Sequence, residues 1–62
     1  MNVFKKGKKY RELRLRYNKT LMDVVSVIGG STGRLEAYEL GITPIPTYVE
    51  EMLDEYFEEL GE

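Results

Sequence analysis

The basic residues of this chain lie near its N-terminus, and side chains of this type bind phosphate. Eight of the nine Lys and Arg residues fall within residues 1–19, whereas ten of the eleven Asp and Glu residues come after them. Evenly scattered charges would only solvate a small domain, but this separation predicts one face that attracts phosphate and another that repels it. The lysines that we expect to contact phosphate are Lys5, Lys6, Lys8, Lys9 and Lys19.

The chain contains no cysteine and no histidine. A disulfide framework, a thiolate zinc site and a cysteine nucleophile are therefore impossible, and no imidazole is present to act as a base. The carboxylates are spaced as one solvated side of a helix, and no other catalytic group accompanies them. We therefore expect a protein that is not an enzyme and that uses no metal, no cofactor and no small-molecule substrate.

A length of 62 residues predicts a single domain with one small core. A chain of this size buries only about 60% of the surface that its unfolded form exposes, so its stability is modest. No apolar run reaches the roughly 20 residues that cross a bilayer, and the N-terminus lacks the apolar stretch of a signal peptide. We expect a cytoplasmic protein without membrane contact.

Two short helices joined by a tight turn are predicted in the middle of the chain. Each begins at a hydroxyl residue, Thr20 or Ser31, that can accept a hydrogen bond from free N–H groups of the helix. Each ends at a glycine, Gly29 or Gly41, and the glycine pair at the turn allows the positive φ of a sharp reversal. This arrangement is a helix-turn-helix.

The first helix of this pair, over residues 20–28, is apolar nearly all round. Thr20 can cap the N–H of Asp23, and the Asp23 carboxylate is favoured in the positive first turn. Such a helix is either buried on several sides or presents an apolar patch to a partner, and both interpretations stay open. The simplest inner face consists of Leu21, Val24, Val25 and Ile28, which leaves Met22 and Val27 as a candidate partner surface.

The N-terminal part is predicted to be a basic arm followed by a helix. The arm covers residues 1–7, and we expect Phe4 to anchor it on the body of the domain. The helix covers residues 8–17 and ends at Asn18 in a left-handed conformation. Its inner face is formed by Tyr10, Leu13 and Tyr17, which recur at helical spacing.

An acidic amphipathic helix is predicted at the C-terminal end, over residues 47–60. Thr47 and Glu50 have the spacing of a capping box, which would start this helix. Its last turns either close the core or overhang it as a dimer seam. The apolar stripe of the helix comprises Tyr48, Val49, Met52, Leu53, Tyr56, Phe57 and Leu60, and the candidate seam comprises Tyr56, Phe57 and Leu60.

These elements predict an all-α fold, a compact four-helix bundle that contains the helix-turn-helix. A five-helix bundle stays open as the alternative. The third helix, over residues 31–40, directs Leu35 and Tyr38 inward. All of residues 1–62 belong to one domain in this interpretation.

The run from Tyr10 to Pro46 resembles the Cro/C1-type (XRE) helix-turn-helix family of phage repressors and bacterial regulators. The spacing matches without a gap from Tyr10 to Gly41, and the fold that the resemblance implies is lambda-repressor-like. The residues that carry the match are Leu13-Arg14, Thr20, Val24-Val25, Ile28-Gly29, Ser31, Leu35, Tyr38-Glu39 and Gly41.

The resemblance implies a structural ion pair and a set of DNA contacts. Arg14 and Glu39 match family residues that form a partly buried ion pair between the first and third helices. Thr20 and Ser31 match phosphate-contacting positions, whereas Leu21 replaces a glutamine that commonly donates to phosphate. The residues at base-reading positions are Thr32, Gly33, Arg34, Glu36 and Ala37, and Arg34 is the one that can form a bidentate contact with guanine.

Two functions follow from these observations. One is a small dimeric DNA-binding transcriptional regulator from a phage or mobile element, with residues 31–40 in the major groove of double-stranded DNA. The other is a helix-turn-helix domain that binds another protein, as an antagonist of a regulator or as part of an assembly. The second function would use the apolar helix 20–28 and the acidic helix 47–60.

Overall fold

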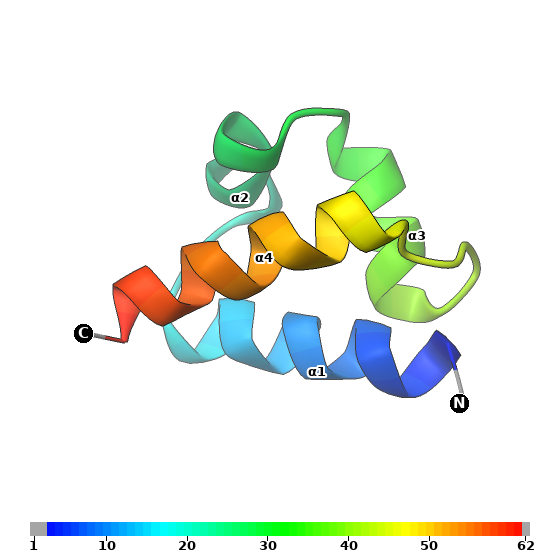
Figure 1. The fold of residues 1–62 in the computed structure, drawn as a ribbon, viewed down its shortest axis with the longest axis horizontal. Coiled ribbons are helices and arrows are strands. Elements are labelled where there is room, and N and C mark those ends of the chain that lie inside the picture. Colours follow the sequence, from blue (N-terminus) through cyan, green and yellow to red (C-terminus); the bar gives the residue numbers. More distant parts are fainter. Residues whose placement is uncertain (1–2, 62) are drawn as a thin grey trace.

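Four α-helices make up the computed structural model, which describes residues 3–61 and the side chains from Lys5 onward (Figure 1). The helices are α1 (Val3–Arg16), α2 (Leu21–Ile28), α3 (Thr32–Leu40) and α4 (Thr47–Leu60). The predicted all-α bundle is confirmed, and within the described residues there is neither a fifth helix nor a strand. The expected anchoring of Phe4 lies outside the described side chains.

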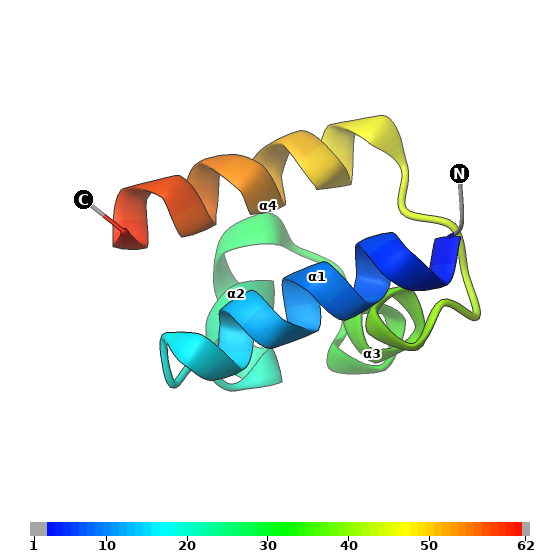
Figure 2. The same cartoon turned by 90° about the horizontal axis from the view of Figure 1, so that it is seen from below.

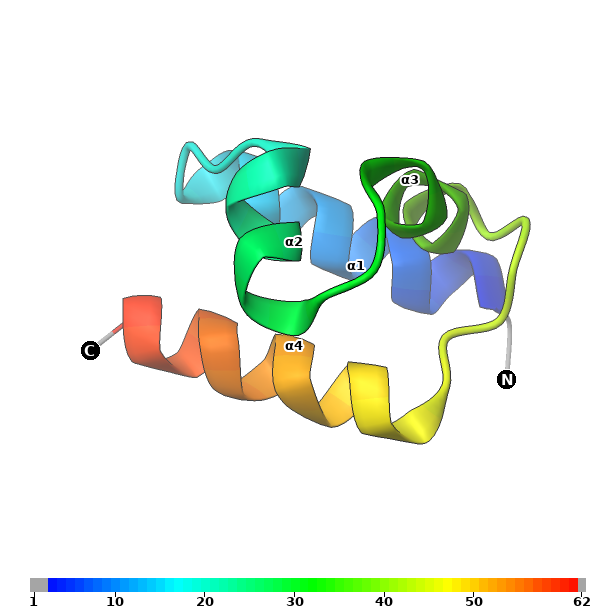
Figure 3. The same cartoon turned by 90° about the horizontal axis from the view of Figure 1, so that it is seen from above.

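The longest helices, α1 and α4, run in the same direction and are connected through the α2–α3 pair. Figures 2 and 3 show that α3 and the N-terminal end of α2 lie on the side of the domain away from α4. The C-terminal end of α2 approaches α4, so the helix-turn-helix bridges the two sides of the domain. In the part of the chain that the structure describes, no helix is long and apolar enough to cross a membrane.

All four helices contribute to the core, with Val24 at its centre. The Phe57 ring stacks against the Tyr10 ring at 6.4 Å and against the Tyr17 ring at 6.3 Å between centroids. The predicted inner faces are therefore correct for α1, α2 and α3. The buried apolar residues are Tyr10, Val24, Leu35, Tyr38, Val49, Leu53 and Phe57.

Of the two interpretations of the last turns of α4, Phe57 supports the one in which they close the core, because it is only 5% exposed. Tyr56 and Leu60 are half-buried and pack against the same core. The reason is that α1 and α4 run in the same direction (Figure 1), which places Tyr10 and Tyr17 against Phe57. The other end of the stripe differs, because Tyr48 is 65% exposed.

The predicted basic arm is helical from Val3 onward, so α1 begins five residues before the expected helix start at residue 8. Packing at Gly7 accounts for the extension. A Cβ atom placed there would lie 2.0 Å from the carbonyl oxygen of Tyr38, so only glycine lets α1 approach the end of α3 so closely. An ion pair between Lys6 Nζ and Glu50 Oε2, at 2.9 Å, joins the same turn of α1 to α4.

The predicted capping box at the start of α4 is also wrong. The N-cap is Pro46, which forms no side-chain cap bond, and Thr47 is the first residue of the helix. In a capping box the Glu50 carboxylate would accept a hydrogen bond from the backbone at the helix start. Here the carboxylate binds Lys6 of α1 instead. A tertiary contact thus replaces the local one.

The other helix ends are as predicted. The Thr20 hydroxyl accepts from Asp23 N at 3.1 Å, and Asp23 Oδ2 accepts from Thr20 N at 2.9 Å, which completes a capping box. The Ser31 hydroxyl accepts from Arg34 N at 3.1 Å. Asn18 has a φ of 57° and Gly41 a φ of 77°, both left-handed.

Candidate nucleic-acid interface and the adjoining pocket

The expected ion pair between Arg14 and Glu39 is present and fixes the helix-turn-helix on α1. Arg14 Nε donates to Glu39 Oε2 at 2.7 Å, and Nη2 donates to Oε1 at 3.0 Å. The Arg14 side chain is 12% exposed and the Glu39 side chain 4%. The hydrogen bond to Glu39 raises the pKa of Arg14. A further bond from Arg14 Nη1 to the carbonyl oxygen of Lys19, at 3.0 Å, ties the segment before α2 to the pair.

The two capping hydroxyls lie at the surface, at the N-termini of α2 and α3. Thr20 and Ser31 are exposed, and each hydroxyl accepts a bond from a backbone N–H. The hydroxyl proton of each residue is thereby free to point outward, where it can donate to a phosphate oxygen. Asp23 counteracts this at α2, because its bonds to Thr20 lower its pKa and keep a negative charge at the helix N-terminus.

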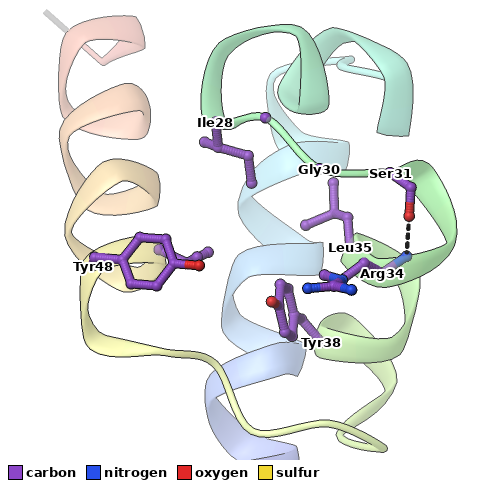
Figure 4. Close-up of a pocket in the computed structure, with 9 residues that line it drawn as sticks. Ile28, Gly30, Ser31, Arg34, Leu35, Tyr38 and Tyr48 are labelled. Atoms are coloured by element: carbon purple, nitrogen blue, oxygen red, sulfur yellow. Dashed lines mark hydrogen bonds between the residues drawn. The ribbon is translucent and has the colours of Figure 1, made fainter.

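The outward face of α3 carries few groups that can read a base. Glu36 and Gly33 are exposed, Thr32 and Ala37 are half-buried, and the only formal charge among these four is negative. The Arg34 side chain is exposed, but it points away from this face. Figure 4 shows its guanidinium directed over Tyr38, toward α4. Of the five residues at base-reading positions, Arg34 is therefore the one whose side chain turns toward α4.

The basic residues of α1 are divided between two sides of the helix. Lys6 binds Glu50, and Lys9 Nζ lies 5.2 Å from the centre of the Tyr10 ring in a surface pocket shared with acidic residues of α4. Both lysines thus lie beside acidic residues of α4, and their contact with phosphate stays a prediction. Lys5 and Lys8 are exposed. Lys19 is half-buried and stands directly before the N-terminus of α2.

The expected apolar partner surface is present on α2. Met22 is 64% exposed and Val27 is 59% exposed, so two of the six apolar residues of this helix are left uncovered. Sequence reasoning missed two further exposed apolar side chains at the end of α3. These are Leu40 and Ile42.

A pocket of about 70 Å³ lies between the α2–α3 turn and the start of α4. Sequence reasoning missed it because its walls come from three separate elements. The one available signal was the spacing of Arg34 and Tyr38, which places both on one side of α3. The lining residues are Ile28, Gly29, Gly30, Ser31, Arg34, Leu35, Tyr38, Tyr48 and Val49.

Comparisons of the chain with protein-family models, with curated proteins and with solved structures found no match. The resemblance to the XRE family therefore rests on the residues quoted above and on the geometry of the helix-turn-helix.

Proposed function

We propose that the chain is a small DNA-binding regulator whose α2–α3 pair docks on double-stranded DNA. The observation that carries this proposal is the exposed pair of capped helix N-termini, held on one side of the domain by the buried bond between Arg14 and Glu39. Helix N-termini with free hydroxyl protons bind phosphate. The outward face of α3, which begins at Ser31, is exposed, and a helix of this size enters the major groove.

The mixed charges on this face favour weak binding to DNA, with attraction of phosphate at some points and repulsion at others. Lys19 is the cation nearest to the N-terminus of α2, whereas Asp23 and Glu36 repel phosphate from the same side. Phosphate neutralisation supplies most of the affinity of proteins that bind DNA nonspecifically. We therefore expect a low salt slope, with sequence preference resting on Arg34 once its long side chain turns toward a base.

The test is fluorescence anisotropy with a duplex selected from a random-sequence pool. Two variants remove the same charge on opposite sides of the domain. Lys19→Ala should weaken binding to all sequences and lower the salt slope by about one, whereas Lys9→Ala should change neither. Arg34→Ala should relax the preference at one base position. The proposal fails if micromolar protein at low salt binds no selected duplex, or if both lysine variants weaken binding equally.

The second candidate is a helix-turn-helix domain that binds a protein through α2. The exposed apolar side chains of Met22 and Val27 favour it, because a two-turn helix rarely leaves two large apolar residues in water without a partner. A second copy of the chain would satisfy this surface and would make the regulator a dimer. Replacing both residues by serine should abolish self-association in sedimentation analysis, whereas Leu15→Ser, at an exposed position of α1, should not.

A further inference from the structure

We propose that the pocket between α3 and α4 binds a small organic oxyanion, a carboxylate or a phosphate ester carried on an apolar body. The pocket shares Ser31 and Arg34 with the proposed DNA contact, but it is closed on its other side by α4, and a bound ligand goes beyond that proposed function. The sequence predicted no small-molecule substrate, and the proposal concerns a bound ligand rather than a reaction.

The polar groups that line the pocket are all hydrogen-bond donors suited to an anion. Figure 4 shows Tyr48 on α4 facing the Arg34 guanidinium and the Tyr38 hydroxyl on α3, with Ser31 at the turn. No carboxylate lines the pocket, and Arg34 forms no ion pair with any described residue. Its positive charge is therefore unopposed, and a guanidinium presents two parallel N–H groups to a carboxylate or a phosphate.

Tyr38 indicates where the oxyanion would lie. Its side chain is only 5% exposed, yet its hydroxyl forms no hydrogen bond to a described residue. The hydroxyl is nevertheless not sealed in the core, because no fully buried side-chain polar atom among the described residues lacks a partner. The pocket is the opening through which this hydroxyl can donate to a ligand oxygen in place of water.

The remaining walls and the size of the pocket restrict the ligand. Ile28, Leu35 and Val49 supply the apolar part of the lining. The volume of about 70 Å³ is several times the roughly 10–15 Å³ that holds one water molecule. The pocket therefore accommodates an oxyanion group and part of an apolar body, with the rest of the body lying against Tyr48 at the open edge.

The experiment is a ¹H–¹⁵N NMR titration of the full chain with benzoate and, separately, with phenyl phosphate at constant ionic strength. Saturable shifts are expected at the amides of Gly30, Ser31, Arg34 and Tyr48. The anion that binds more tightly identifies the headgroup as carboxylate or phosphate. Benzyl alcohol, which lacks the charge, should give no saturable shift.

Tyr38→Phe keeps the buried ring and removes only the hydroxyl. It should weaken binding at least about tenfold, because a hydrogen bond to an anion is lost. Tyr48→Phe tests the same point at an exposed position where folding is not at risk, and Tyr56→Phe, outside the pocket, should bind like the unmodified chain.

Three results would each overturn the proposal. The first is the absence of saturable shifts from both anions up to about 10 mM, a concentration high enough to detect a dissociation constant of more than about 1 mM. The second is an equal response to benzyl alcohol. The third is unchanged affinity in the folded tyrosine variants. None of these results bears on DNA binding, which is measured with Lys19→Ala.

Discussion

Arg14 shows how a single side chain holds the helix-turn-helix in place. Its guanidinium makes three hydrogen bonds, two to Glu39 and one to the backbone before α2, in a largely buried setting. Arg14→Ala leaves the Glu39 carboxylate buried and unpaired, so we expect the free energy of unfolding to fall by about 3 kcal/mol. Urea unfolding measures this change. Arg11→Ala, at an exposed position of the same helix, is the control, and equal stability of the two variants would contradict the role of the pair.

Tyr10 makes the domain less stable at alkaline pH. Burial raises its pKa above the ordinary value, and the hydrogen bond of 2.6 Å to Asp54 raises it further. The unfolded chain loses the phenol proton near pH 10 while the folded chain keeps it, so the free energy of unfolding should decrease as pH rises above about 10. Urea unfolding between pH 8 and about 11 should show a shallower decrease in Tyr10→Phe. An identical decrease in both proteins would contradict this assignment.

At the scale of the elements, two glycines inside helices have opposite roles. A Cβ atom at Gly7 would meet the backbone of α3 at 2.0 Å, whereas a Cβ atom at Gly33 would meet nothing within 4 Å. Gly7→Ala should therefore separate α1 from α3 and lower the free energy of unfolding by about 2 kcal/mol or more. Gly33→Ala should raise it by about 1 kcal/mol, because alanine favours the helix. Thermal unfolding compares the two variants, and a stable Gly7→Ala protein would refute the close approach.

At the scale of the whole molecule, charge is distributed over two opposite sides. One side carries the carboxylates of α4, together with Lys6, which binds Glu50, and Lys9, which lines a surface pocket with Asp54 and Glu58. Glu36 is the negative charge on the outward face of α3, which the proposed DNA contact would place against the duplex. Glu36→Gln should raise the affinity for random-sequence duplex DNA about threefold at low salt, whereas Glu55→Gln on α4 should not. Equal anisotropy titrations for the two variants would indicate that α3 does not face the duplex.

The sequence by itself determined the features that depend on neighbours along the chain. The caps at Thr20 and Ser31, the left-handed Asn18 and the inner faces of three helices follow from local hydrogen bonds and from helical spacing. The pairing of Arg14 with Glu39 came from the resemblance to a family, since two residues 25 positions apart have no local signal.

Only the tertiary structure decided the features that depend on contacts between helices. Gly7 lets the longer α1 approach α3, the Glu50 carboxylate binds Lys6 of α1 instead of capping its own helix, and Phe57 is enclosed by the rings of Tyr10 and Tyr17. The direction of Arg34 was decided in the same way, because the space beside Tyr38 exists only when α3 and α4 are packed. Local rules determine where a helix begins and which side is apolar, but the partner of a long side chain is determined by the element that packs beside it.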